Sequence, residues 1–301
     1  MDRFDAISTL IAAVDGGSLS AASRALGMPL PTVSRKVSEL EAHLGTQMVV
    51  RTSRKLLLTD AGKAFVEASR RVLSDLDEAE RAASGEYQTP RGELLITAPI
   101  MFGKLHILPI VLEFLRAYPD VNVRFVMADT VVDLLDNHID VAARLGRLPD
   151  SGLVATRVGE VRWITCASPG YLAQRGTPEV PADLAGHDCL AFEGLQTLRS
   201  WSFGPGTGQE PIAIPPRLAV NTADALIEAA ADGLGVARMM SYQAATALRE
   251  DRLVRLLQAY EPETIPVHLV HTGPSLLPLK LRAFLDFAGP RIRQALKALP
   301  A

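Results

Sequence analysis

The sequence predicts an α/β protein that carries a small all-α unit at its N-terminus. Three observations indicate this fold class: short amphipathic helical segments fill the first part of the chain, one unbroken helical segment runs from Asp60 to Tyr87, and strand and helix patterns alternate after Gly92. A chain of 301 residues is long for one compact domain, so we expect two or three folding units. A composition that is 48% hydrophobic and 22% charged supplies an ample core and argues against disorder.

The N-terminus does not have the pattern of an export signal. It mixes polar and apolar side chains, includes Asp2, Asp5 and Asp15, and lacks a basic flank that leads into an apolar run. No stretch of the sequence is apolar for long enough to cross a membrane. We therefore expect a cytoplasmic protein without a membrane-bound part.

Two helices are predicted before residue 27. Apolar residues at helical spacing predict a first helix with one buried stripe: Phe4, Ile7, Leu10, Ile11 and Val14. After Gly16 and Gly17, Ser18 is a good N-cap for a second helix over 19–25, whose alanines let another helix approach closely. Gly27 is expected to end this helix, because glycine adopts the left-handed turn of a tight helix-helix corner.

A third helix is predicted to begin near Pro31 and to end at Gly45, with Val33, Val37 and Leu40 in a buried stripe that Leu44 extends. Its opposite side carries hydroxyls and cations, which contact phosphates and base edges. This order is typical of a helix-turn-helix: two short helices, a tight turn, and a third helix with hydroxyls and cations on its exposed side. We expect DNA contacts from this region: Ser18, Ser20, Leu30, Pro31, Thr32, Ser34, Arg35 and Lys36.

Two strand-like runs, 47–50 and 56–58, predict a hairpin with a basic tip, placed as a wing beside the third helix. Its expected DNA contacts are Arg51, Ser53, Arg54 and Lys55. Between Arg24 and Leu58, six basic residues stand against two acidic ones, a local net charge of +4 in a chain of net charge −3. An amphipathic helical domain with solvated charges is the alternative, which the order of helices, glycines and basic tip disfavours.

A long helix over 60–87 has the pattern of a dimerisation element. Apolar and small residues alternate at spacings of four and three, as in the seam of a two-helix coil: Phe65, Ser69, Val72, Leu76, Ala79 and Ala83. A helix of about 28 residues extends roughly 40 Å, too long for the small preceding domain to cover. The alternative is that it packs on its own C-terminal domain. Residues 88–92 then resemble a linker.

The N-terminal residues resemble those of the LysR-type transcriptional regulators. The resemblance is carried by residues 18–27, by 31–37 with Leu40 and Glu41, and by Arg51-Thr52-Ser53-Arg54 leading to 58–62. It extends over essentially the whole chain. Pro29 and Leu30 depart from the Ser-Gln that is frequent in the family, so Leu30 offers a thymine methyl contact where a glutamine base contact is absent. Val49 stands where relatives usually have an aromatic residue.

The C-terminal half shows alternating strands and helices, which predicts parallel sheet flanked by helices. Strands are expected at 94–98, 121–127, 139–144, 217–220, 236–239 and 267–271, and helices at 105–117, 131–137, 223–231 and 279–296. The family resemblance implies a two-lobed effector domain of the periplasmic-binding-protein type. We expect a winged helix-turn-helix over 1–59, a linker and dimerisation helix over 60–89, and an effector-binding domain over 90–301. Its first lobe would comprise about 90–164 and 267–301 and its second about 165–266, with crossovers near 165–167 and 265–267.

Ligands of open α/β folds lie beyond the carboxyl ends of the strands, which predicts the residues of an effector cleft. The candidates are Pro99, Ile100, Met101, Phe102, Asp129, Arg144, Phe192, Asn221 and Thr222. Arg144 is a natural partner of a carboxylate or phosphate, and the helix start at Thr222 offers free amides to an anion. In the alternative interpretation Met101 and Phe102 are plain core, and Arg144 pairs with Asp129 or Asp133.

No enzyme, metal or cofactor motif stands out, so we expect none of the three. Gly204 to Gly208 is glycine-rich but leads toward a strand, which indicates a hairpin or loop and not a phosphate cradle. Cys166 and Cys189 lack metal-type spacing and are interpreted as small, partly buried side chains, with a redox sensor as the alternative.

Two other protein classes share parts of this pattern. A solute-binding protein uses the same two-lobed fold, but its export signal is missing here. An architectural DNA-binding protein would ignore ligands. For a regulator, the expected partners are double-stranded DNA with an imperfect palindromic operator, a small-molecule effector, and further copies of the chain in a homodimer or homotetramer. RNA polymerase is a further partner, whose recruitment the bound regulator would change.

Overall fold

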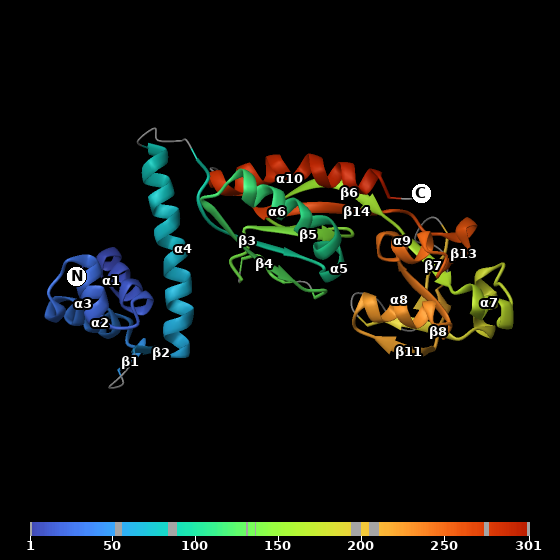
Figure 1. The fold of residues 1–301 in the computed structure, drawn as a ribbon, viewed down its shortest axis with the longest axis horizontal. Helices are drawn as coiled ribbons and strands as arrows, with labels where there is room; N and C mark the ends of the chain where they lie inside the picture. The colour runs from blue at the N-terminus through green and yellow to red at the C-terminus, as the bar shows by residue number, and fades with distance from the viewer. Residues whose placement is uncertain are drawn as a thin grey trace. The chain divides into compact units, whose positions relative to one another are not determined.

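The computed structural model describes residues 2–51, 56–83, 89–130, 132–135, 137–193, 200–204, 211–273 and 277–299. The chain forms two compact units, Met1–Gln88 and Thr89–Ala301 (Figure 1). Each unit has its own hydrophobic core.

The N-terminal unit contains four helices and a two-stranded hairpin among its described residues. These are α1 (Arg3–Asp15), α2 (Leu19–Leu26), α3 (Leu30–Leu44), β1 (Val49–Arg51), β2 (Leu56–Leu58) and α4 (Asp60–Ala83). All six elements were predicted, and β1 and β2 pair antiparallel with Val49 opposite Leu58. The tip of the hairpin, residues 84–87 of the long predicted helix and residue 88 of the predicted linker lie outside the described residues.

Strand β1 begins at Val49 and not at residue 47 as the sequence indicated, and a side chain of α3 binds the backbone at this point. The amides of Met48 and Val49 donate to Oε1 of Glu41 at 2.8 and 3.0 Å. Glu41 therefore holds the start of the hairpin against α3 and orients the wing that follows.

Local capping explains where the helices begin and end. The hydroxyl of Ser18 accepts a hydrogen bond from the amide of Ala21 at 3.1 Å, as expected of an N-cap. Gly27 ends α2 with a φ of 62°, in the left-handed region that favours glycine. The bounds of α2 are therefore encoded by the residues at its two ends, and Gly27 starts the turn toward α3.

The core of the N-terminal unit lies beneath α1, α3 and α4. Its buried members are Ala6, Leu10, Val37, Leu40, Met48, Val49 and Val66. The buried face of α1 is rotated from the predicted stripe, since Phe4 is 48% exposed while Ala6 and Ala13 are fully buried. Small side chains at these positions let α2 and α3 approach α1 closely.

The C-terminal unit contains two five-stranded sheets. The first has the order β4-β3-β5-β14-β6 and the second β11-β8-β12-β7-β13. The first lobe comprises β3 (Gly92–Ala98), β4 (Val121–Met127), β5 (Val141–Leu145), β6 (Leu153–Val161) and β14 (Ile265–Thr272), with α5 (Ile100–Phe102), the π-helical stretch η1 (Gly103–Ile107), α6 (Leu108–Ala117) and α10 (Leu279–Lys297). Helices α6 and α10 cover one face of this sheet (Figure 1).

The second lobe lies between β6 and β14 in the sequence. Its sheet is formed by β7 (Trp163–Ala167), β8 (Cys189–Phe192), β11 (Pro216–Val220), β12 (Val236–Met240) and β13 (Val254–Leu256), and a hairpin by β9 (Ser200–Trp201) and β10 (Ile212–Ala213). Its helices are α7 (Pro169–Arg175), η2 (Pro181–Gly186), α8 (Ala223–Ala231), α9 (Ser241–Arg249) and η3 (Gln258–Tyr260). The chain passes between the lobes at Arg162 and again before Ile265, so the first passage precedes the expected 165–167.

Two local predictions in the first lobe were wrong. The helix after β3 begins at Ile100 and not near residue 105, and it continues through η1, a widened turn that precedes Pro109. The helix expected at 131–137 is absent from its described residues, which form coil and a turn. There the amide of Leu135 donates to the Asp133 carboxylate at 2.8 Å, and His138 adopts a φ of 51°, so the backbone turns back toward β5.

No single helix among the described residues is long and apolar enough to cross a membrane. The pair Arg3–Asp15 and Leu19–Leu26 passes the same test only together, with a bend of 118° between the two helices.

Candidate functional site

The N-terminal half of α3 presents an exposed surface. Leu30 and Pro31, in the first turn, are exposed, and the Arg35 side chain is 70% exposed. Arg35 Nε lies 3.8 Å from Glu39 Oε1, a surface ion pair of small energetic value. Arg35 is therefore free to exchange this partner for a phosphate or a base edge.

Thr32 and Ser34 are half-buried, and Lys36 faces inward. The ammonium of Lys36 pairs with the Asp5 carboxylate, lies 3.5 Å from Met28 Sδ, and its side chain is only 19% exposed. Lys36 thus links α3 to α1, although the sequence placed it with the DNA contacts. Its role toward DNA stays a prediction.

The remaining DNA candidates lie on α2 and on the wing. Ser18 caps α2 with its hydroxyl, and Ser20 is exposed in the first turn of the same helix. The side chain of Arg51 and the whole of Ser53, Arg54 and Lys55 lie outside the described residues. Arg24, exposed in the last turn of α2, adds a cation that the sequence-based candidates omitted.

A cavity of about 210 Å³ lies between the two lobes. The first lobe and the returning strand contribute Pro99, Asp129, Leu145, Gly146 and Ile265. The second lobe contributes Trp163, Ala191, Phe192, Trp201, Arg238, Met239, Met240, Tyr242 and Gln243. Three of the predicted effector residues, Pro99, Asp129 and Phe192, therefore lie together in its wall.

Ile100, Met101 and Phe102 follow Pro99 but do not line this cavity. The amide of Ile100 donates to Oδ1 of Asp129 at 3.0 Å, which fixes that carboxylate in the wall. Met101 packs against the cores of both lobes. Phe102 is fully buried and meets the Tyr242 ring edge-on at 5.5 Å, so it supports the cavity from behind.

Arg144 lies on β5 outside the lining of the cavity. Its Nη2 donates to the carbonyl oxygen of Val132. Burial lowers the pKa of the Arg144 guanidinium, and the nearby Asp133 carboxylate partly opposes this effect. Arg144 thus holds the turn after β4 in place.

Asn221 and Thr222 are also absent from the lining, and both are exposed where β11 leads into α8. The Thr222 hydroxyl accepts from the amide of Ala225 at 3.4 Å and caps α8. One of the amides expected to face an anion is therefore already bound within the helix start.

Sequence reasoning missed the buried cation of the cavity, Arg238. It lies in the middle of β12, is 7% exposed, and faces the rings of Phe203 and Trp163 with its Cζ 5.1 and 5.6 Å from their centroids. Burial lowers its pKa to about 10, an effect that the Glu261 carboxylate opposes. A lone charged residue inside the apolar run Val236–Met240 was the available signal.

Tyr242 and Gln243 form the polar edge of the cavity. Burial raises the pKa of the Tyr242 hydroxyl, and the Asp129 carboxylate adds to the rise, so the phenol stays protonated. Gln243 accepts a hydrogen bond from the amide of Met240 through Oε1 at 2.9 Å. This edge of the cavity therefore combines one carboxylate, that of Asp129, with the neutral hydrogen-bonding groups of Tyr242 and Gln243.

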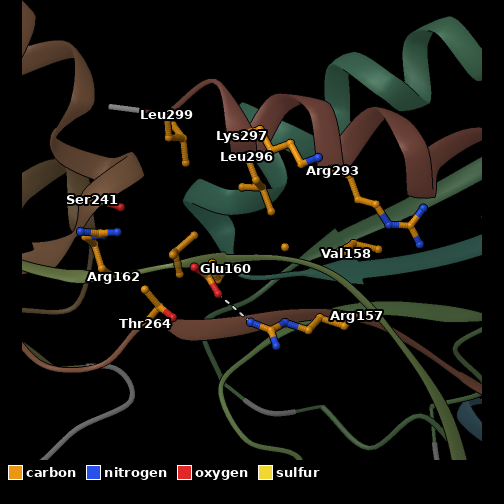
Figure 2. A pocket seen from close by; sticks show the side chains of 12 residues that line it. Arg157, Val158, Glu160, Arg162, Ser241, Thr264, Arg293, Leu296, Lys297 and Leu299 are labelled. Atoms are coloured by element: carbon orange, nitrogen blue, oxygen red, sulfur yellow. Dashed lines mark hydrogen bonds and ion pairs between the residues drawn. The ribbon is translucent and has the colours of Figure 1, made fainter. Parts of the chain in front are cut away.

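Figure 2 shows a second cavity, of about 450 Å³, beside β6 and the C-terminal end of α10. Its cationic side chains are Arg157, Arg162, Arg293 and Lys297. Arg157 binds Glu160 at 2.6 Å, and Arg293 and Lys297 are exposed. Because water solvates exposed cations, this cavity holds no buried charge that demands a ligand.

Both cysteines are buried and free. Burial raises the pKa of each thiol, Cys166 and Cys189, to about 12, so neither forms a reactive thiolate near neutral pH. Among the residues that the structure describes, no cluster of three His, Cys, Asp or Glu side chains is arranged to hold a metal ion.

Two family models match the chain over its two units. One, described as bacterial regulatory helix-turn-helix protein, lysR family, matches residues 4–63, and another, LysR substrate binding domain, matches residues 87–293. The chain belongs to the LysR family. Its helix-turn-helix and its two-lobed α/β domain are thereby those of a LysR-type regulator, which confirms the fold class and the family resemblance.

Individual LysR-type relatives cover nearly the whole chain. An HTH-type transcriptional regulator of Xanthomonas campestris pv. campestris is 34% identical over 93% of this chain and 82% of the relative. CrgA of Neisseria meningitidis serogroup C is 31% identical over 93% of this chain and 94% of the CrgA sequence. These relatives are named as transcriptional regulators and not as enzymes.

Solved LysR-type structures have the same architecture. The structure of CrgA from Neisseria meningitidis matches with a TM-score of 0.61 at 29% identity and covers 97% of this chain and 98% of that one. The full-length structure of the Vibrio cholerae virulence activator AphB matches with a TM-score of 0.60 at 26% identity, over 94% of this chain and 97% of that one.

Proposed function

We propose that this LysR-type protein is a sequence-specific DNA-binding transcriptional regulator whose activity changes when a small molecule binds between its two α/β lobes. The observation that carries the proposal is the exposed N-terminal half of α3 within a LysR-family helix-turn-helix. A regulator of this kind acts on chromosomal DNA, which places it in the cytoplasm, and it needs no catalytic activity.

The DNA side of the proposal rests on α2, α3 and the wing. Leu30, Pro31 and Arg35 are the exposed candidates at the start of α3, supported by the half-buried Thr32 and Ser34. In a helix-turn-helix these positions enter the major groove, where cations contact guanine edges and phosphates and an apolar side chain contacts a thymine methyl. Ser18, Ser20 and the basic wing are proposed to contact the backbone.

The regulator is proposed to act as a homodimer or homotetramer on an imperfect palindrome. The exposed seam residue Val72 on α4 supports pairing of this helix with its copy. A symmetric protein requires an approximately symmetric operator. We further propose the functional division 1–59, 60–89 and 90–301.

The effector side rests on the cavity between the lobes. Residues from both lobes line it, so an occupant contacts both, and binding couples to their relative arrangement. The ligand shifts this equilibrium only to the extent that it binds one arrangement more tightly than the other. The resulting change would alter the geometry of the paired domains on DNA. It would thereby alter the recruitment of RNA polymerase.

The test compares purified full-length protein on the DNA upstream of its own gene with random DNA of equal length over a salt series. A specific regulator binds the upstream fragment about 10³-fold or more tightly, and both affinities fall as salt rises. Footprinting then locates the operator. Equal affinity for both DNAs would contradict the proposal and favour an architectural protein.

A further inference from the structure

Arg238 differs from the other arginines of the second lobe in having a buried guanidinium without a counter-ion in contact. Among the described residues, no side chain or carbonyl accepts a hydrogen bond from this guanidinium. By contrast, the neighbouring Arg255 binds both oxygens of the Glu261 carboxylate at 2.6 Å. Glu261 is thereby already engaged, and only its longer-range charge reaches Arg238.

A buried cation of this kind requires compensation. Removing a guanidinium from water costs free energy unless its N–H groups donate to acceptors. Even when burial lowers its pKa, an arginine keeps its proton at neutral pH. The rings of Trp163 and Phe203 hold the guanidinium by cation–π contact but accept no strong hydrogen bonds. The adjoining cavity is the place from which acceptors can come.

The remaining walls define what else the occupant carries. Trp163, Phe192, Trp201, Met239 and Ile265 make most of the surface apolar or aromatic. The same cavity also contains the carboxylate of Asp129, which repels a second negative charge. A volume of about 210 Å³ corresponds to about seven water molecules, room for a small ring with a short substituent.

We propose that Arg238 anchors the carboxylate of a small aromatic monocarboxylate in the cavity between the lobes. The two carboxylate oxygens accept parallel N–H bonds from the guanidinium, and the ring lies against the aromatic wall. This inference rests on the proposed function only in naming that ligand as the effector of the regulator. Arg238 is a specificity-determining residue, because a neutral isostere would leave its charge uncompensated.

The protein carries its own reporter for the test. Trp163 and Trp201 are the only two tryptophans of the chain, and both line this cavity. Intrinsic tryptophan fluorescence of the full-length protein therefore reports occupation directly. The probes are benzoate, phenylacetate and 3-phenylpropionate, each paired with its neutral amide.

At least one carboxylate is expected to give a saturable fluorescence change, with its amide at least tenfold weaker. Arg238→Met is expected to weaken carboxylate binding at least tenfold and to remove the preference over the amide. Arg238→Lys keeps the positive charge but loses the planar guanidinium that donates two parallel hydrogen bonds. Its affinity for the carboxylate is expected to lie between those of the wild type and Arg238→Met. If Arg238→Met fails to fold, judged by circular dichroism, Arg238→Lys and the wild-type amide comparison still decide the result.

Arg293→Met is the matched control, because it removes a cation from the second cavity and is expected to leave binding unchanged. The proposal is overturned if none of the carboxylates binds, if amides bind equally well, or if Arg293→Met and not Arg238→Met abolishes binding. The same preparations are then footprinted on operator DNA. Carboxylate binding without any change in the footprint would refute the effector role and leave the binding site standing. Intact operator binding without carboxylate binding would refute the site and leave the proposed DNA-binding function standing.

Discussion

Arg35, Arg144 and Arg238 carry the same side chain into three environments. Arg35 is exposed beside Glu39, Arg144 donates to a carbonyl of its own lobe, and Arg238 is buried without a partner in contact. Arg144 supports a turn, whereas Arg35 is proposed to contact DNA and Arg238 to bind an anion.

Replacing Arg35 by alanine should weaken operator binding by about tenfold at fixed salt, or about 1.4 kcal/mol, because one phosphate or base contact is lost. Fluorescence anisotropy with a labelled operator measures this. Arg249→Ala, which removes an exposed arginine from α9, serves as the control and should leave the affinity unchanged. Unaltered affinity in Arg35→Ala would show that the recognition-helix assignment is wrong.

Replacing Arg144 by alanine should abolish the response to the inducer while operator binding stays intact. Without its bond to Val132 the turn after β4, which follows Asp129 in the chain, loses its anchor. A reporter gene under the operator, with and without inducer, gives the readout. A normal response would exclude Arg144 from any part in sensing.

Cys166 and Cys189 should react with a thiol reagent only after unfolding. Both are buried, and the pKa of each is raised to about 12, so little thiolate forms in the folded protein at about pH 8. Labelling with Ellman's reagent in buffer and in guanidinium chloride checks this. Rapid labelling of a native thiol would revive the redox-sensor interpretation.

At the scale of elements, the sequence predicted best where local signals act alone. Helix α2 begins after Ser18 and ends at Gly27, as expected, and the alternation of side chains from Val121 to Met127 correctly predicted β4. Both predictions rest on local properties, helix capping and the alternation of side chains along a strand. The helix expected at 131–137 failed because Asp133 binds the backbone of its own turn. The start of β1 was placed two residues too early; Glu41, a side chain of the preceding helix, binds the backbone of Met48 there.

Gly62 connects two elements at close range. A Cβ at this position would lie 2.1 Å from the carbonyl oxygen of Met48, which belongs to the backbone and cannot yield easily. Gly62→Ala should therefore destabilise the N-terminal unit by about 1–3 kcal/mol. Urea unfolding of the full chain provides the measurement.

The control for this substitution is Gly170→Ala, where an added Cβ meets nothing within 4 Å. Its stability should stay near that of the wild type. Equal stability of the two variants would mean that the start of α4 can move away from the backbone of Met48.

The predicted pairing seam of helix α4 leads to a separate prediction about the oligomeric state. Val72 lies on the predicted seam and is 52% exposed. Val72→Glu places a charge in the proposed helix pair and should shift the chain toward the monomer in sedimentation velocity. Glu80→Gln, exposed off the seam, should leave the assembly unchanged; a monomeric wild type would refute the pairing.

At the scale of the whole molecule, the site was predictable in part. Pro99 and Asp129 follow strands and Phe192 is the last residue of one, positions that topology alone marks as ligand-binding. Arg238 and Trp201 were missed because they reach the cavity only when strand β12, the hairpin β9–β10 and the first lobe come together. The lone charge inside the apolar run Val236–Met240 marks Arg238 as unusual, but no local pattern shows which cavity it lines.

Stability should fall on mild acidification because of His106. Its Nε2 is buried without a hydrogen-bond partner among the described residues, and burial lowers the pKa of the imidazole. The unfolded chain takes up this proton near pH 6.5, and the folded protein only at lower pH. The stabilisation is therefore fully present above this pH and is lost as the pH falls through it.

The measurement is the Tm at about pH 7.5 and about pH 5.5. His106→Phe keeps a ring between Phe102 and Tyr242 and should lose less stability on acidification. His43→Gln, exposed on α3, should behave as the wild type. An identical loss in His106→Phe would assign the pH dependence to other groups.

Strand β12 lies between β7 and β8 and is bonded to both through its backbone. These backbone hydrogen bonds do not involve the side chain of residue 238. If Arg238 selects the effector as proposed, its exchange for a neutral residue is expected to change the class of inducing metabolite. We expect the operator to stay the same, because the helices proposed to read it belong to the other unit of the chain.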